Sequence, residues 1–169
     1  MNQRNHMKIG LGGGCHWCTE AVFMSLRGVR NVQQGWIASE GENYQWSEAV
    51  WLEFDPLVIS LKDLIQVHLN THASTSSHSM RQKYRSAVYY SNEAQKKEVV
   101  RALRELSESF DKPVITTALK FEKLKLNQEN HLEYFKKNGR NQFCERYIHP
   151  KLEMLKLEFS NLVDSENLN

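Results

Sequence analysis

Two cysteines and a histidine follow a run of glycines near the start of the chain, in the segment GLGGGCHWCTEAVF at 10–23. The apolar residues before the glycines predict a buried strand, and the pattern after them predicts a helix that begins at about Cys15. The free N–H groups and the positive dipole at a helix start stabilise an anion, so the pKa of Cys15 should be lowered. His16 adds positive charge there when it is protonated. Together these residues favour a nucleophilic thiolate at position 15.

The other two cysteines leave more than one role open. Cys18 lies three residues after Cys15, which places it on the same helical face and one turn inward. It is able to attack an oxidised Cys15, but burial argues for a slower thiol, and free cysteines are also common as small core residues. Cys144 stands in GRNQFCERYIHP. An odd number of cysteines without a secretory signal favours redox or metal chemistry over a disulfide scaffold.

Strands and helices must together position these thiols. Strands are expected at 7–11, 31–39, 46–54, 84–90 and 113–121, and helices at 15–27, 61–72, 92–110, 127–138 and 150–163. Ser60 and Ser91 are the expected N-caps of the second and third helices. Because the two kinds of element are interspersed, we expect an α+β or α/β sandwich with a mixed β-sheet. The 169 residues fit one catalytic domain, which ends in a helix and a polar tail at 151–169.

Composition and charge exclude several classes of function. A formal net charge of +2, without a concentrated basic surface, argues against nucleic acid as a partner. No apolar stretch approaches the ~20 residues that a membrane span needs, and residues 1–10 lack the apolar run of a signal peptide. We therefore expect a cytoplasmic monomer that has no membrane partner, no metal and no bound cofactor.

Glu48 is a candidate general acid. In an extended strand, alternate side chains point to the same face, so Glu48 shares a face with Trp46, Val50, Leu52 and Phe54. A carboxyl group among apolar side chains loses hydration, which favours its neutral, protonated form. The alternative is a carboxylate at the end of a strand that pairs with a cation.

Several segments in order resemble the A-type peptide methionine-S-sulfoxide reductases. GLGGGCHWCTEAVF resembles the family signature GCFWxxE, and GWIAS stands where the family has GYxGG. WSEAVWLEFDPLVISLKDLIQVHLNTH is similar to HAEAVxVxYDPxxISYxxLLxxFxxxHDP, KYRSAVY to QYRSAIY, and HLEYFKKN to HQxYLxKNP. The resemblance covers a core at about 7–150 in unbroken order. It implies a single α+β domain, a two-layer sandwich with a mixed sheet and a ferredoxin-like core.

The resemblance also implies an activity, the reduction of methionine S-sulfoxide, free or in proteins, to methionine. Cys15 would attack the sulfoxide and become a sulfenic acid, while Glu48 protonates the oxygen that leaves. Tyr84 would hold that oxygen with its hydroxyl group, although a tyrosine of the core is the alternative. Cys144 would be the resolving cysteine, because a flexible segment can carry its thiol to the sulfenic acid, and Cys18 is the alternative. Thioredoxin would then reduce the disulfide.

Four further residues are expected to bind substrate. Trp17 corresponds to the tryptophan of the signature and is the natural apolar wall for the methyl group. Trp36 stands where the family has a second oxygen-binding tyrosine, and its indole N–H can still donate a hydrogen bond. His16 replaces a phenylalanine and Ser79 replaces an aspartate, which predicts that His16 and the loop at 76–81 adapt the pocket to another sulfoxide.

Other functions remain as alternatives. A thioredoxin-like dithiol oxidoreductase would use CHWC as its redox pair, with Pro113 on the substrate side. A divergent homologue that binds oxidised methionine without reducing it is a second possibility. A zinc module would use the ligands Cys15, Cys18, Cys144 and His149, but a second pair at ordinary spacing is absent. His68 and His72, at i and i+4 of a helix, would face a metal together or serve as ordinary core or surface groups.

Overall fold

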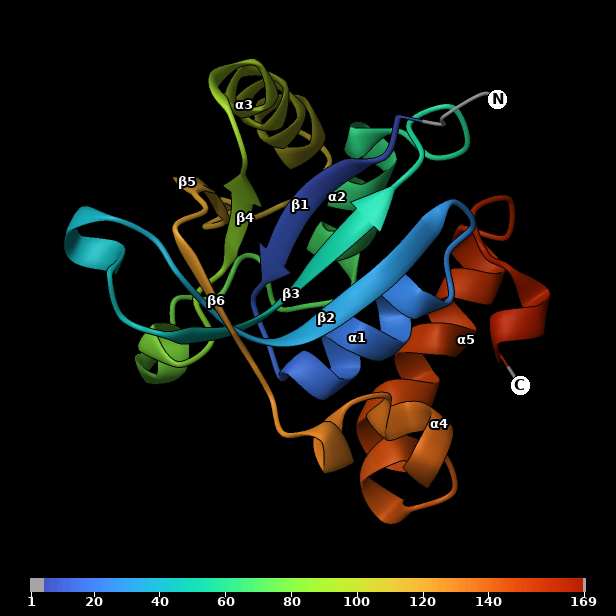
Figure 1. Cartoon of the computed structure of the whole chain (residues 1–169). Coiled ribbons are helices and arrows are strands. Elements are labelled where there is room, and N and C mark those ends of the chain that lie inside the picture. The colour runs from blue at the N-terminus through green and yellow to red at the C-terminus, as the bar shows by residue number, and fades with distance from the viewer. Residues whose placement is uncertain (1–4, 169) are drawn as a thin grey trace.

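The computed structural model describes residues 5–168 and contains one six-stranded sheet in the order β5-β4-β1-β3-β2-β6 (Figure 1). Residues 1–4 and 169, which the expected single domain includes, lie outside the described residues. The strands are β1 (Met7–Gly12), β2 (Val29–Ala38), β3 (Ser47–Phe54), β4 (Ala87–Tyr90), β5 (Thr117–Lys120) and β6 (Lys123–Leu126). The helices are α1 (His16–Met24), α2 (Leu61–Asn70), α3 (Glu93–Ser107), α4 (Tyr134–Asn138) and α5 (His149–Glu158).

The order of these elements defines the class of fold. The succession β1-α1-β2-β3-α2-β4, with the spatial order β4-β1-β3-β2, is the ferredoxin-like arrangement, and β5 and β6 extend it at the two edges. All neighbouring strands are antiparallel except β4 and β5, which run parallel. The expected α+β class, mixed sheet and ferredoxin-like core are therefore confirmed.

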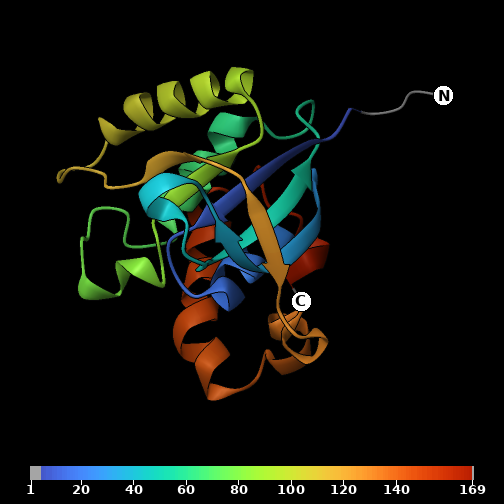
Figure 2. The same cartoon turned by 60° about the vertical axis from the view of Figure 1, so that its left-hand side comes forward.

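Alternation of side chains along the strands separates the two faces of the sheet. Ile9, Leu11 and Val50 are fully buried in the main core, together with apolar side chains of α1, α2, α3 and α5. Trp51 and Tyr89, which point the other way, form a small cluster on the opposite face. The main helices thus cover one face and make two layers (Figures 1 and 2). Within residues 5–168, no helix is both long and apolar enough to span a bilayer.

Several element limits differ from those expected. Ser60 caps α2 by accepting a hydrogen bond from the N–H of Asp63, as expected. The third helix is capped by Asn92 and not by Ser91, because the Asn92 side chain accepts from the N–H of Gln95 at 2.9 Å. The expected strand at 113–121 is only four residues long, and the expected helix at 127–138 shortens to a 3₁₀ turn and α4. Strand β6, with the half-charged sequence KLKL, was not expected at all; it pairs with β2 and leads towards the C-terminal helices (Figure 2).

Two histidines of the α2 region, His68 fully buried and His72 partly buried, support the turn that leads to Cys15. The side chain of His68 donates from Nε2 to the carbonyl oxygen of Gly12 at 2.8 Å. The ring of His72 packs so closely on Gly13 that a Cβ there would lie 2.5 Å from it, and its Nε2 lies 2.8 Å from the Ser86 hydroxyl. Both rings therefore have structural partners, and among the described residues no group of three or more His, Cys, Asp or Glu side chains is placed to hold a metal.

These histidines should make stability depend on pH. Burial lowers the pKa of His72 to about 4, and that of His68 well below its ordinary value. The unfolded chain binds protons near pH 6.5 whereas the folded chain does not, so the free energy of unfolding should fall between about pH 6.5 and pH 4. His72 alone should account for about 3 kcal/mol of this loss. Denaturant unfolding at several pH values measures this loss. H72Q, whose amide can still form a hydrogen bond with Ser86, should lose less stability between about pH 6.5 and pH 4. An identical pH dependence in both proteins would contradict this prediction.

Candidate active site

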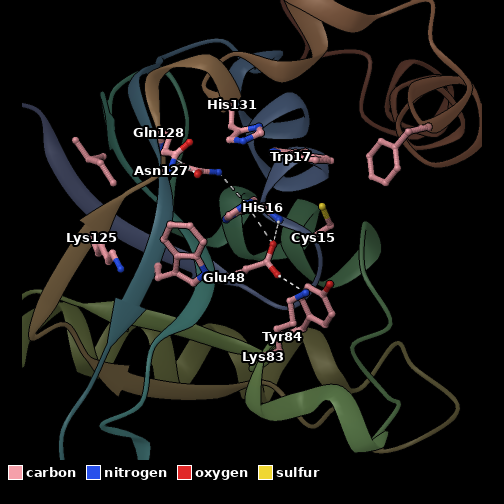
Figure 3. A pocket seen from close by; sticks show the side chains of 13 residues that line it. Cys15, His16, Trp17, Glu48, Lys83, Tyr84, Lys125, Asn127, Gln128 and His131 are labelled. Carbon is pink, nitrogen blue, oxygen red and sulfur yellow. Dashed lines mark hydrogen bonds and ion pairs between the residues drawn. The ribbon is translucent and has the colours of Figure 1, made fainter.

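A pocket of about 610 Å³ opens beside the first turn of α1, within the volume range of small-molecule sites (Figure 3). Its walls combine the start of α1 with β2, β3, the segment before β4 and the segment that follows β6. The lining residues are Cys15, His16, Trp17, Trp36, Glu48, Lys83, Tyr84, Lys125, Leu126, Asn127, Gln128, His131 and Phe143.

Cys15 is the residue that caps the N-terminus of α1, and it is only partly buried. A hydrogen bond from the Cys18 thiol has the largest effect on its pKa and lowers it, and hydrogen bonds from the backbone N–H groups of Trp17 and Cys18 act in the same direction. Burial opposes them, as does Glu48 whenever its carboxyl group is ionised, but the net pKa remains below that of an ordinary thiol. The pKa of Cys15 is thus lowered, as the sequence predicts, but the first cause is the Cys18 thiol, and the N–H groups at the helix start come after it.

Cys18 is the immediate neighbour of Cys15 and has the opposite character. Its side chain is buried, and the hydrogen bond with Cys15, followed by burial, raises its pKa strongly. Cys18 therefore keeps its proton to a higher pH than Cys15 does. This arrangement agrees with the expected slower thiol one turn inward.

Glu48 enters the pocket from β3 and is almost fully buried. Because side chains alternate along β3, Glu48 lies on the helix-covered face of the sheet with Val50, as expected. Its neighbours at this end of the strand are polar, however. Its Oε1 lies 3.3 Å from Nε2 of His16, and its Oε2 lies 3.6 Å from Nζ of Lys83. Trp46, expected to continue the apolar row, precedes the strand and is 43% exposed.

His16 is buried beneath the pocket and does not serve as a simple replacement for an apolar ring. Its Nδ1 donates to the carbonyl oxygen of Gly35 at 2.9 Å, and its Nε2 lies 3.2 Å from Nδ2 of Asn127. Burial lowers the pKa of His16, which favours the neutral imidazole, although the Gly35 carbonyl partly offsets this effect. The pocket floor is consequently more polar than the family signature implies.

Aromatic side chains form the walls. The indole of Trp17 stacks in parallel on the ring of Tyr134, with centroids 4.0 Å apart and an interplanar angle of 1°. Trp36 lies directly opposite Glu48 in the β2–β3 pairing and meets His16 edge-on at 5.1 Å. Tyr84 lines the same pocket, and in Figure 3 its ring lies below Cys15 and Glu48. Trp17, Trp36 and Tyr84 therefore meet where the sequence placed them.

The wall that carries Tyr134 is fastened to α1. Glu20, the glutamate of the signature, is almost fully buried, and its two carboxylate oxygens accept the N–H groups of Glu133 and Tyr134 at 3.0 Å each. Burial raises the pKa of Glu20, and the two N–H groups counteract that effect. The backbone of Glu133 adopts a positive φ of 52° at this point. The contact fixes the C-terminal segment beside the thiol.

Not every expected residue lies in the pocket. Ser79 is exposed in a 3₁₀ turn and does not line the cavity, and Pro113 is likewise exposed in a loop. Cys144 is fully buried in a π-helical turn, Cys144–Ile148, and not in a flexible segment, because Asn141 holds its backbone N–H and the core covers its side chain. Burial raises the pKa of Cys144.

Sequence reasoning missed several residues that line the site. Lys83 is the first residue of the matched KYRSAVY block and His131 the first of HLEYFKKN, so both lie within recognised segments without a role being assigned. Asn127 follows β6, and because this strand was not expected, neither was the position of the amide. A motif identifies the residues that it contains, whereas these contacts depend on how separate segments pack.

The chain is similar to known proteins along nearly its whole length. A family model described as "Peptide methionine sulfoxide reductase" matches residues 7–162. "Peptide methionine sulfoxide reductase MsrA" of Thermus thermophilus is 32% identical, with 90% of this chain and 95% of the relative covered. The protein of the same name from Psychrobacter cryohalolentis is 31% identical, with 93% and 98% covered.

Solved structures share the fold. Mxr1 from Saccharomyces cerevisiae in reduced form superposes with a TM-score of 0.71 at 20% identity, covering 86% of this chain and 93% of the other. Methionine sulfoxide reductase A of Corynebacterium diphtheriae gives a TM-score of 0.69 at 19% identity, with 83% and 78% covered. With the sequence match over residues 7–162, this establishes that the chain belongs to the peptide methionine sulfoxide reductase family.

Proposed function

We propose that this chain reduces methionine S-sulfoxide to methionine and is recycled by thioredoxin. One observation carries the proposal: a cysteine whose pKa is lowered by its neighbours opens into the same pocket as a buried carboxyl group and a tyrosine hydroxyl. Such a pocket supplies a nucleophile, a proton donor and a hydrogen-bond donor for the oxygen of the substrate. The aromatic wall around Trp17 and Tyr134 suits the methyl group of methionine.

The chemical step needs one proton. The Cys15 thiolate attacks the sulfoxide sulfur, and two electrons pass from the cysteine sulfur to the substrate sulfur. The sulfur–oxygen bond of the substrate breaks, and the oxygen, with one proton from Glu48, becomes the hydroxyl of a Cys15 sulfenic acid while methionine leaves. Tyr84 orients the oxygen with its hydroxyl group.

An assay with separated epimers tests this function. The purified chain, thioredoxin, thioredoxin reductase and NADPH are incubated with the S or the R epimer of methionine sulfoxide, free or in a peptide. We expect methionine from the S epimer only, with NADPH consumed in equal amount. Binding without methionine release would instead identify the divergent homologue, and reduction of insulin disulfides alone would identify a dithiol oxidoreductase.

The resolving thiol is a separate question, and we propose Cys18 as the first to attack. The Cys18 thiol already donates a hydrogen bond to the Cys15 sulfur, and the two cysteines also line a second pocket of about 390 Å³. The main cause of its raised pKa is the hydrogen bond with Cys15. Oxidation turns Cys15 into a neutral sulfenic acid, which is no longer a thiolate acceptor for the Cys18 proton. Attack by Cys18 then forms a disulfide and releases water. Cys144 also acts electrostatically on Cys18 and packs in the same core, and we propose it as the thiol that attacks the disulfide next.

Single-cysteine variants separate the two routes. C18S should release one equivalent of methionine without reductant and then turn over at least about tenfold more slowly with thioredoxin. C144S should keep a large part of the thioredoxin-driven rate, because a disulfide between residues 15 and 18 still forms. Rapid cycling of C18S together with a stalled C144S would assign the resolving role to Cys144, as the sequence alone predicts.

The partner and the location follow from the same chemistry. Among the proteins that share this fold is Mxr1 from Saccharomyces cerevisiae in complex with Trx2, which supports a thioredoxin as reductant. Thiols that must be regenerated function best in a reducing compartment, in agreement with the cytoplasmic location that the sequence predicts. The monomeric state also remains a prediction, and size-exclusion chromatography with light scattering measures it.

A further inference from the structure

A chain of hydrogen bonds runs through His16, Asn127 and Gln34, and backbone carbonyls fix its direction at both ends. Figure 3 shows the contacts of His16 with Asn127 and Glu48. At one end, the Gly35 carbonyl oxygen lies 2.9 Å from Nδ1 of His16. At the other end, the carbonyl oxygen of His131 lies 3.1 Å from Nε2 of Gln34. A carbonyl oxygen only accepts, so His16 must carry a hydrogen on Nδ1 and Gln34 must turn its amide nitrogen towards His131.

Asn127 connects the two ends. Its Nδ2 donates to Oε1 of Gln34 at 2.7 Å and faces Nε2 of His16 at 3.2 Å. The amide cannot be reversed without loss, because its Oδ1 accepts the N–H of Gln128 at 2.8 Å. Nε2 of His16 therefore faces an N–H group and acts as an acceptor, which requires the neutral imidazole. Burial, which lowers the pKa of His16, acts in the same direction.

The same Nε2 lies 3.3 Å from Oε1 of Glu48. An ionised Glu48 would turn a lone pair towards the lone pair of Nε2 in a buried place, an arrangement that is repulsive. A protonated Glu48 converts the contact into an O–H···N hydrogen bond. The Lys83 ammonium lies 3.6 Å from the other carboxyl oxygen, and the backbone N–H of His16 donates to Oε1 at 3.4 Å; both favour the ionised form. The imidazole of His16 therefore acts on Glu48 against Lys83 and against the backbone N–H of its own residue.

We propose that His16 is a positioning residue that accepts a hydrogen bond from the carboxyl group of Glu48 and so keeps this acid protonated for the sulfoxide. The proposal rests on the function proposed above, and it assigns to His16 a role different from lining the methyl pocket. Phenylalanine, which the family signature carries at this position, has no acceptor and cannot act in this way.

The hydrogen bond does not prevent transfer of the proton. At 3.3 Å it is long, and Nε2 shares its one lone pair with Asn127, so a sulfoxide oxygen at closer range is the better acceptor. When the proton moves to that oxygen, the Glu48 carboxylate is left beside Lys83, which stabilises it. Water then returns a proton to Glu48 for the next turnover.

Other charged groups face this pair and contribute to its pH dependence. The charges of Lys83 and His131 reach His16 and lower its pKa, and that of Cys15 interacts with Glu48. Lys83 also lies 5.0 Å from the centre of the Tyr84 ring. The proposed role of His16 requires the Cys15 thiolate and the Glu48 proton at the same time, so the rate should fall on the acidic side as Cys15 gains a proton and on the alkaline side as Glu48 loses its own.

The test is the rate of the first methionine release, measured without reductant from about pH 5 to pH 10. H16F should move the alkaline half-point of this rate down by about one pH unit relative to wild type, a tenfold change in hydrogen-ion concentration. In H16Q, the amide oxygen can accept the hydrogen bond from Glu48, so the alkaline half-point should return most of the way to the wild-type value. The acidic limb is assigned independently from the pH dependence of Cys15 alkylation in each protein.

H131F is the matched control, because it removes another histidine of the same pocket, one whose ring stacks on Trp17 instead. Because the charge of His131 acts on the imidazole of His16 and not on Glu48 itself, H131F should move the alkaline half-point far less than H16F does, whatever it does to the rate. An unshifted alkaline limb in H16F would overturn the role of His16, even if that variant is slower. An H16Q variant whose alkaline half-point moves as far as that of H16F would also overturn the role of His16. A wild-type protein that releases no methionine from either epimer would instead refute the proposed function.

Discussion

C15S should lose methionine release by roughly 10⁴-fold or more, because a neutral serine hydroxyl is a far weaker nucleophile than a thiolate. The substitution keeps the size of the side chain and its place at the N-terminus of α1, where the N–H groups can still bond an oxygen. Binding of substrate should therefore survive. The measurement is methionine released by excess enzyme in one turnover, followed for hours so that a slow rate is detected.

Alkylation of wild type provides the companion measurement. One thiol should react with iodoacetamide faster than a peptide cysteine below pH 7, and peptide mapping should place the label on Cys15, because the pKa of Cys15 is lowered and those of Cys18 and Cys144 are raised. C15S should lose this fast label. A C15S variant that still reduces the sulfoxide at more than a hundredth of the wild-type rate would refute the nucleophile, as would ordinary reactivity at position 15.

E48Q should lower the first-turnover rate by about 10²–10³-fold, as expected when a general acid is removed. Glutamine has nearly the same shape and can still bond His16, so the fold should be retained while the proton that the sulfoxide oxygen needs is missing. The residual rate should depend little on pH on the alkaline side, because the group that titrates there is gone. Thermal unfolding of the variant shows whether the fold is intact.

E53Q is the matched control for this prediction. Glu53 lies on the same strand but pairs with Arg30 at 2.8 Å on the surface, away from the pocket. The same chemical change there should leave the rate within about twofold of wild type. An E48Q variant as active as E53Q would show that water or another group supplies the proton.

The fold was largely predictable because its signals are local. Alternating apolar residues in β3 and the Ser60 cap of α2 each determine their own element. The errors lie where tertiary contacts decide the structure. The sequence of β6 alternates lysine and leucine, and it forms a strand because it pairs with β2. This pairing needs a glycine at position 35, since a Cβ there would lie 2.0 Å from the Lys125 carbonyl oxygen.

The site was predictable in part for the same reason. Cys15, Trp17 and Glu48 belong to recognisable segments, and the pocket brings them together. The polar setting of Glu48 was not predictable, because Lys83 reaches it from a different segment and His16 turns towards it from the start of α1. Side-chain alternation indicates which face a residue occupies, but it does not identify the neighbours that reach that face from other parts of the chain.

The two hydrogen bonds to Glu20 have a mechanical consequence. Glu20 and Cys15 stand on one short helical stretch, so a tilt or slide of α1 moves the nucleophile and the Glu133–Tyr134 backbone in concert. The distance between the Cys15 sulfur and the aromatic wall at Tyr134 therefore changes little when the helix shifts thermally relative to the sheet.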